Sequence, residues 1–446
     1  MARYPQTRVL HQLVEQFGLY AQLQTEYGAR GVLRAAARLE RQVRAATAGL
    51  RALPPEPRQA AREPDALAAI QALRPRGPRR LWRTLPAARY TERLEGALLA
   101  RCAGCTLGAP VEGWPVERMA ALAAANGQEF PPVDYWRSVP DDEEKRYALS
   151  PRAAYTRPGM AGVPVDDDLA YTLLGLLIAE EYGPEFTTAD VAAAWLRFLP
   201  YACTAEDVAL RNLKAGVAPE RAAVVDNPYS QWIGADIRAD PWGYLAPGWP
   251  ERAAAMAYRD AFLSHRRQGI YGAMFFAAAI SAAFALDDPV EAVRVGLTEI
   301  PRDCALARAV RWALRQAPQI TDFRAARAAV DRRFAGMHPV HTINNACLTV
   351  WGLTIGGRDV TRVLGETVAM GLDNDCTAAT AGSLVGAVVG KAGVPSHWYD
   401  RFDDTVHSYL IGRRRFGIRA LIRRFGRQAR RVHGREPACG AEEGRA

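Results

Sequence analysis

The chain has 446 residues, 49% of them apolar, and a formal net charge of +9. This composition excludes a disordered protein and is typical of a globular one with a large core. The charge is uneven, because arginines crowd the segment from Thr405 to Arg435, which contains no acidic residue. The basic balance therefore belongs to one tail and does not indicate a nucleic-acid groove in the core.

Residues 1–85 predict a helical extension followed by a linker. Leu10, Leu13 and Val14 recur at helical spacing, and the Pro-rich segments 53–57 and 74–78 break the pattern. Helical periodicity then continues through residues 86–412, which we expect to form a catalytic domain. Residues 413–446 are the Arg-rich tail.

Strand signals are scarce, so the sequence predicts an all-α fold. Residues 270–286 and 376–394 are apolar enough to resemble membrane spans, but they are rich in Ala and Gly. We interpret them as buried core helices and expect no membrane span.

The seven cysteines are odd in number and scattered, and the first residues resemble no signal peptide. Reduced thiols and a cytoplasmic location are the expectation. Cys102 and Cys105 form one C-x-x-C pair without a second pair at zinc spacing, which disfavours a zinc site.

Two acidic groups each open an apolar helical run. Asp166, Asp167 and Asp168 precede the first, and Asp373 and Asp375 precede the second. One aspartate suffices to cap a helix, whereas several adjacent carboxylates repel one another and are costly to bury. Hard divalent cations with oxygen ligands would neutralise them, so the pattern predicts a metal site.

The two helices that follow are expected to pack side by side and bring their acidic ends together. Gly382, Gly386 and Gly390 recur every four residues in the second helix, which would allow close approach of a neighbouring backbone. Free amides at each helix N-terminus would keep the carboxylates ionised.

Several motifs in this order resemble the ADP-ribosylglycohydrolase family, which includes dinitrogenase reductase-activating glycohydrolases and ADP-ribosyl-acceptor hydrolases. They are Gly104-Cys-Thr-Leu-Gly-Ala-Pro-Val-Glu112, Asp166-Asp-Asp-Leu-Ala-Tyr-Thr172, Gly371-Leu-Asp-Asn-Asp-Cys-Thr377 with its glycine-rich helix, and Val394-Pro-Ser-His-Trp398. The resemblance covers about residues 90–400.

The resemblance implies an orthogonal multi-helix bundle with a central binuclear cleft for two Mg²⁺ or Mn²⁺ ions. It implies hydrolysis at C1″ of an ADP-ribosyl group carried by a protein or a small molecule. The implied metal ligands are Asp166, Asp167, Asp168, Asp373, Asp375 and Cys376. Asp166, Asp168 and Glu112 are the candidate catalytic carboxylates for protonating the leaving group, and the sequence does not choose among them.

Three departures from the family pattern stand out. Asp166 and Cys376 replace threonine ligands, and Cys105 stands where many members have aspartate. A thiol is a poor ligand for Mg²⁺, and the extra carboxylate of Asp166 would compensate for the lost hydroxyl.

The predicted substrate contacts are Gly234, Arg238 and His265. The segment 231–243 resembles the family's substrate loop, in which a Gly234 amide would approach the diphosphate and Arg238 would pair with phosphate. Arg238 is alternatively an ion-pair partner of Asp236 or Asp240. His265 follows Ser264 as in the family's Thr-His dipeptide, and alternatively is a satisfied structural histidine.

Two other functions remain open from the sequence. One is a hydrolase of the same fold acting on a free nucleotide sugar or N-riboside, and the other is a catalytically silent ADP-ribose-binding protein. The intact acidic set favours an enzyme. The tail is expected to be solvated or, alternatively, a basic amphipathic helix for an anionic surface or nucleic acid. The modified residue type, the physiological target and the oligomeric state are not encoded in these motifs.

Overall fold

The computed structural model describes residues 4–5, 7–140, 146–147 and 149–434. The chain divides into two compact units. The first comprises Met1–Arg62 with Phe334–Met337, and the second Glu63–Arg333 with His338–Ala446. Each unit is described by itself.

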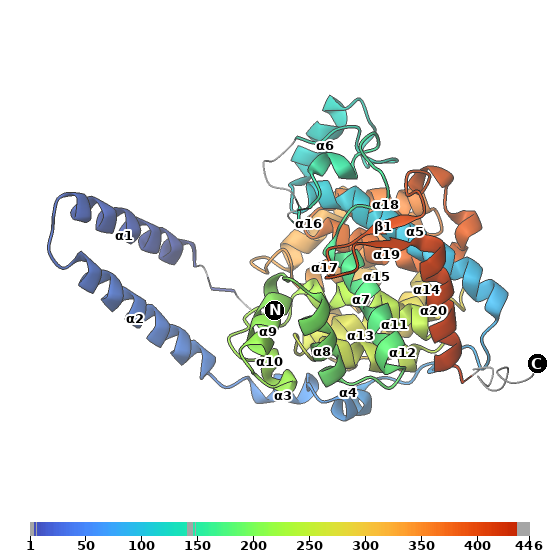
Figure 1. The fold of residues 1–446 in the computed structure, drawn as a ribbon, viewed down its shortest axis with the longest axis horizontal. Coiled ribbons are helices and arrows are strands. Elements are labelled where there is room, and N and C mark those ends of the chain that lie inside the picture. Colours follow the sequence, from blue (N-terminus) through green and yellow to red (C-terminus); the bar gives the residue numbers. More distant parts are fainter. Residues whose placement is uncertain (1–3, 6, 141–145, 148, 435–446) are drawn as a thin grey trace, which may run out of the picture. The chain divides into compact units, whose positions relative to one another are not determined.

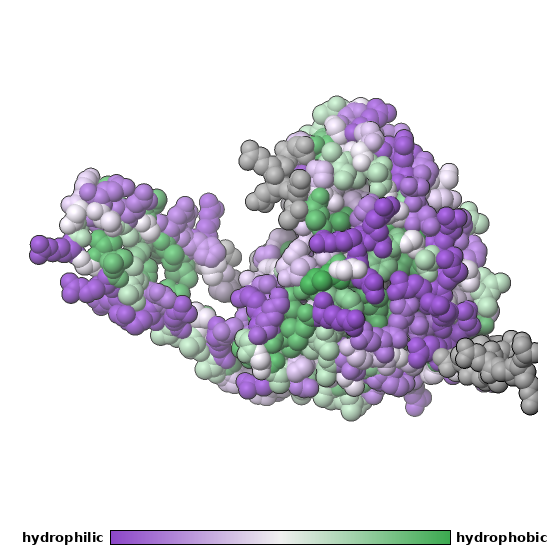
Figure 2. All heavy atoms as spheres, in the orientation of Figure 1, coloured by the Kyte–Doolittle hydropathy of each residue, from purple (hydrophilic) through white to green (hydrophobic). Residues whose placement is uncertain are grey.

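The first unit carries α1 (Arg8–Glu26), α2 (Val32–Arg51) and α3 (Pro57–Arg62). The predicted apolar stripe is present on α1, where Leu10 and Leu13 are exposed, and no residue of α1 or α2 is buried. Figure 2 shows apolar side chains gathered along these two helices. The helices therefore form as predicted, but within this unit they do not enclose a core.

The second unit consists of helices and their connecting loops with almost no sheet, which confirms the predicted all-α fold. Its α-helices are α4 (Leu67–Leu73), α5 (Ala87–Gly108), α6 (Val116–Ala125), α7 (Asp167–Tyr182), α8 (Thr188–Phe198), α9 (Thr204–Lys214), α10 (Pro219–Ala222), α11 (Asp240–Leu245), α12 (Pro250–Ala261), α13 (Gln268–Ala283), α14 (Pro289–Gly296), α15 (Ala305–Gln316), α16 (Phe323–Arg333), α17 (Thr342–Gly356), α18 (Val360–Ala369), α19 (Asn374–Val389) and α20 (Ile418–Val432).

Short 3₁₀ helices and one small hairpin complete the second unit. The 3₁₀ helices are η1 (Ala109–Val111), η2 (Arg152–Tyr155), η3 (Ile233–Arg238), η4 (Ala317–Gln319), η5 (Lys391–Gly393) and η6 (Ser396–Trp398). Strands β1 (Thr405–His407) and β2 (Arg415–Gly417) pair antiparallel, with Val406 opposite Phe416.

Helices α5 and α19 lie side by side at the centre of this unit (Figure 1). A Cβ on Gly382 of α19 would overlap the backbone of Ala100, and one on Gly108 of α5 would lie 2.5 Å from the Asp375 backbone. The glycines thus allow the predicted close approach. Their partner is α5, however, and the expected direct packing of the two acidic helices on each other is wrong.

The two apolar segments are core helices. Every residue of α13 is buried, and α19 is buried from Asn374 to Val388. Among the described residues, no helix combines the length and the apolar character needed to cross a bilayer. Cys102, Cys105, Cys203, Cys304, Cys347 and Cys376 are free thiols, and Cys439 lies outside the described residues.

The Arg-rich tail folds as α20, so the expectation of a solvated end is wrong for residues 418–432. Leu421, Phe425 and Ala429 are buried, and α20 contacts α5, α7 and α11. Arg424 pairs with Glu180 of α7 at 2.6 Å. The second unit therefore includes α20 and begins at Glu63. Compactness does not test independent folding, so the domain limits at residues 85 and 412 stay a prediction.

Candidate metal centre

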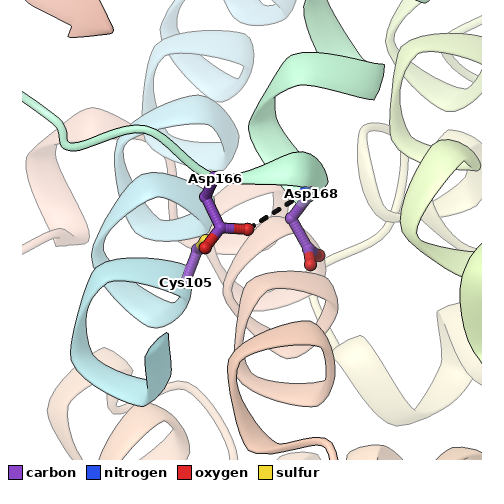
Figure 3. Close-up of side chains that lie close together, drawn as sticks. All are labelled: Cys105, Asp166 and Asp168. Carbon is purple, nitrogen blue, oxygen red and sulfur yellow. Dashed lines mark hydrogen bonds between the residues drawn. The ribbon is translucent and has the colours of Figure 1, made fainter. Parts of the chain in front are cut away.

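The three aspartates of the first acidic group, Asp166, Asp167 and Asp168, have different surroundings at the start of α7. Asp166 caps the helix, its Oδ1 accepting a hydrogen bond from the Asp168 amide at 3.0 Å. Figure 3 shows these two carboxylates at the start of α7, with Cys105 of α5 beside Asp166. Asp167 points to the cavity described below, whereas Asp166 and Asp168 are buried. Capping therefore accounts for one aspartate of the three.

The second acidic group opens α19. Asp373 and Asp375 are both buried, and the Asp373 amide donates to Asn345 Oδ1 at 3.3 Å. Burial, together with the nearby Glu112 carboxylate, raises the pKa of Asp375 to about 6. Burial also raises the pKa of Asp373, and the adjacent Asp375 adds to the shift. Ionising both carboxylates thus requires a nearby positive charge.

Three linked groups of side chains have the spacing of metal ligands. They are Cys105 with Asp166 and Asp168, Asp168 with Asp375 and Cys376, and Glu112 with Asp373 and Asp375. In each group the candidate ligand atoms lie within 4.8 Å of one another. Asp168 and Asp375 each belong to two groups, so the helix starts do meet at one point although α7 and α19 do not pack along each other.

The donor set fits a hard divalent cation. Asp373 Oδ1 and Asp375 Oδ1 are buried and, within the described part of the chain, accept no hydrogen bond. Buried oxygens of this kind are normally satisfied, and a cation with oxygen ligands would satisfy both. Such a cation would be held by Asp373 and Asp375, with Glu112 and Asp167 at the cavity.

Cys376 acts in the structure as a hydrogen-bond donor. Its Sγ lies 3.1 Å from Asp168 Oδ2. Burial and the neighbouring carboxylates, Asp168 first among them, raise the pKa of the thiol well above its ordinary value. The neutral thiol therefore serves as a hydrogen-bond donor more readily than as a metal ligand.

One arginine supports the cluster from the core. Arg101 of α5 is fully buried and pairs with Asp240 at 2.7 Å and Asp168 at 3.4 Å. Its Nη2 also donates to the Asp168 and Ile237 carbonyl oxygens at 2.8 Å. This side chain fixes Asp168 and the end of η3 to the central helix.

A second arginine approaches from the cavity. Arg146 donates to Asp375 Oδ2 at 2.5 Å, Glu112 Oε2 at 2.6 Å and Asp166 Oδ2 at 3.1 Å. The next residue, Tyr147, donates its hydroxyl to Asp167 Oδ1 at 2.5 Å. These two residues bring a cation and a proton donor to the acidic cluster.

A cavity of about 300 Å³ opens onto the cluster. Its walls include Glu112, Asp167, Asp373, Asp375 and Cys376 of the predicted site. Gly234 lines it as well, and a Cβ on this residue would overlap the Glu206 carboxylate. The cavity thus joins the acidic residues to one of the three predicted substrate contacts.

The other two predicted substrate contacts lie behind this wall. Arg238 is buried and pairs with Glu206 at 2.6 Å and Asp260 at 2.8 Å. The suggested partners Asp236 and Asp240 are therefore the wrong ones. His265 is fully buried, and its Nδ1 lies 2.8 Å from Ser264 Oγ. Neither side chain lines the cavity.

Sequence reasoning missed Arg101, Arg146 and Glu206. Arg146 directly follows the charged run 141–145 and so resembled part of a solvated loop. Arg101 is the one charged residue in the segment from Gly96 to Gly108 of α5, and a buried arginine there needs an acidic partner, which was the available signal. Glu206 is one carboxylate on a helix face, and only the fold places it beside Gly234.

Comparison with known proteins agrees with the motifs. A model of the ADP-ribosylglycohydrolase family matches residues 86–433. No curated protein matches the chain. A solved chain described as an ADP-ribosylglycohydrolase-related protein complex shares 20% identity, with a TM-score of 0.49 over 78% of this chain and 99% of that one. The family model spans most of the chain, including both acidic helix starts, and on that match the chain belongs to the ADP-ribosylglycohydrolase family.

Proposed function

We propose that this protein is a divalent-metal-dependent hydrolase that cleaves the glycosidic bond at C1″ of an ADP-ribosyl group. The observation that supports it most is the convergence of Asp167, Asp373, Asp375 and Glu112 on one cavity. Family membership supports a hydrolase, and the cluster supplies the oxygen ligands that Mg²⁺ or Mn²⁺ prefers. The substrate would be an ADP-ribosylated protein or small molecule, and the reduced thiols within the cluster accord with the cytoplasm.

Bound divalent cations would supply positive charge that orients the ribose hydroxyls and favours attack by water. Of the predicted proton donors, Glu112 lines the cavity, with 39% of its side chain exposed, whereas Asp166 and Asp168 are buried beneath it. We therefore assign the leaving-group proton to the Glu112 carboxyl, on Oε1, because Oε2 accepts a hydrogen bond from Arg146. The bond from C1″ to the leaving atom breaks and the leaving atom takes that proton, while the oxygen of water bonds to C1″ and the proton that the water loses returns to the Glu112 carboxylate.

The part of the cavity wall that contains Gly234 would bind the rest of the substrate. The missing side chain of Gly234 makes room for the Glu206 carboxylate, and a diphosphate would contact the η3 backbone where Gly234 lines the cavity. Arg238 and His265 would act on this wall from behind, because Arg238 holds Glu206 and both bond to Ser264. The substrate would then contact Gly234 directly, whereas Arg238 and His265 would set the shape of the wall.

The test is release of ADP-ribose from a panel of arginine-, serine- and nucleotide-linked substrates in the presence of Mg²⁺ or Mn²⁺. Asp375→Asn and Asp167→Asn should each lower turnover by about 100-fold or more, since ligand loss removes charge stabilisation at the reacting centre. The matched control is Asp331→Asn, which changes an exposed carboxylate on α16. ADP-ribose binding without release from any substrate would identify a binding protein and contradict the proposal.

A further inference from the structure

Arg146 occupies the middle of the acidic cluster. Its guanidinium contacts Asp166, Asp375 and Glu112, and these three carboxylates together represent all three groups with metal-ligand spacing. A planar guanidinium with several donors is suited to binding more than one carboxylate at once. The positive charge sits where a cation would otherwise bridge the same oxygens.

The arginine is held in this position by its own segment. Arg146 and Ser150 exchange backbone hydrogen bonds of 2.9 and 3.1 Å, and Nη1 also donates to the Ala109 carbonyl oxygen at 3.1 Å. Tyr147 stacks on Tyr201, and the Tyr201 hydroxyl donates to the Tyr147 carbonyl oxygen at 3.0 Å. The arginine side chain is 17% exposed, so it is a built part of the site.

The oxygens that Arg146 engages differ from those left without a partner. It binds the Oδ2 atoms of Asp166 and Asp375 and the Oε2 atom of Glu112. Asp373 Oδ1 and Asp375 Oδ1, both buried, accept no hydrogen bond within the described residues. The cluster thus has one region filled by a protein cation and another with free ligand atoms.

We propose that Arg146 takes the place of one of two divalent cations, so that the protein binds a single ion at Asp373 and Asp375 while the guanidinium neutralises the remaining carboxylates. The inference rests on the proposed metal site and determines its stoichiometry. A second ion cannot use Asp375 Oδ2 and Glu112 Oε2 while they accept hydrogen bonds from the arginine, and the two positive charges repel.

Equilibrium dialysis and calorimetry with Mn²⁺ alone, without substrate, test the inference. The wild-type protein should bind one ion per chain. Arg146→Met, which keeps the length of the side chain and removes its charge, should bind a second ion at least about tenfold more tightly than the wild type does, because the competing charge is gone. Arg146→Lys keeps the charge and should stay close to the wild type.

Arg157→Met is the matched control. Arg157 is 24% exposed and pairs with Asp134 and Asp400 outside the cavity. Its loss should therefore leave the affinity for the first and for the second ion unchanged. If Arg146→Met folds poorly without metal, it is refolded with Mn²⁺, and recovery of its thermal transition supports the inference, whereas no recovery contradicts it.

The outcomes separate this inference from the proposed function. The role of Arg146 is overturned if Arg146→Met raises the affinity for the second ion by less than about tenfold. It is also overturned if the wild type and the variant bind two ions equally well. Either result leaves the proposed metal-dependent hydrolase standing. Absence of Mn²⁺ binding in every variant overturns both.

Discussion

The acidic cluster meets an arginine on each of two sides, and the two sides are built differently. On the core side, Arg101 has no exposed surface and bonds to carboxylates, backbone carbonyls and the Thr172 hydroxyl. On the cavity side, Arg146 is partly exposed, and three of its five side-chain hydrogen bonds to described residues go to carboxylates. A charge pair in the core stabilises the fold, whereas at a cavity a bound ion can replace the arginine of the pair.

Arg101→Leu should break the core side and have the largest effect. Removing one partner of a buried ion pair leaves Asp240 and Asp168 uncompensated, which costs about 3–5 kcal/mol of unfolding free energy. Urea denaturation measures the loss. Arg146→Leu in saturating Mn²⁺ should cost much less, because an ion can replace the lost charge. Equal losses in the two variants would show that the sides are not different.

Phe425→Ala should lower the unfolding free energy by about 3 kcal/mol, because the substitution leaves a cavity next to the residues that support Arg101. Phe425 packs edge-on against Tyr244, with ring centroids 5.4 Å apart. The Tyr244 hydroxyl lies 2.6 Å from Ser383 Oγ, and Ser383 donates to Asp240, the partner of Arg101. Removing all residues after Gly412 should therefore abolish cooperative unfolding.

The control for this region is Arg419→Ala, an exposed change on the same helix with 77% of the side chain in solvent. It should leave the unfolding midpoint nearly unchanged. A soluble truncation after Gly412 with wild-type stability would mean that α20 contributes nothing to the core, despite its buried face.

The features that could be predicted from the sequence are local ones. Acidic groups followed by apolar spacing indicated a helix after each group, and α7 and α19 do begin there, at Asp167 and Asn374, because these signals lie within a few residues. The pairing of Arg146 with carboxylates far along the chain, and the packing of α20, depend on which surfaces the fold brings together. The apolar spacing of the tail is visible in the sequence. Its burial could not be predicted, because it depends on packing against α5, α7 and α11.

Cys376 lies between the two sides, and its replacement should have a smaller effect. The thiol donates to Asp168, which Arg101 holds from the core. Cys376→Thr keeps a donor and should preserve Mg²⁺-dependent turnover, while Cys376→Ala should lower it by about tenfold or less, the effect of one neutral hydrogen bond. Collapse of turnover in both variants would indicate thiol chemistry at this position.

Glu206 offers the finest test, because it lines the cavity yet is buried like a core residue. Burial raises its pKa from 4.5 to about 7, and Arg238 opposes the shift. The folded state thus keeps its proton at a pH where the unfolded state has lost it, so the contribution of Glu206 to stability is present below about pH 4.5 and falls as the pH rises to about 7. In metal-free protein, Glu206→Gln should flatten the decline of unfolding free energy across this window.

The comparison is made by urea denaturation at several pH values, with Glu291→Gln as the control. Glu291 lies on α14, with 59% of its side chain exposed and no part in the cavity, so its variant should follow the wild-type pH profile. Because Arg238 keeps Asp260 as a partner in Glu206→Gln, the variant leaves no arginine unpaired. Parallel profiles for Glu206→Gln and the wild type would show that Glu206 is solvated through the cavity. This wall would then resemble the exposed surroundings of Arg146 and not the buried surroundings of Arg101.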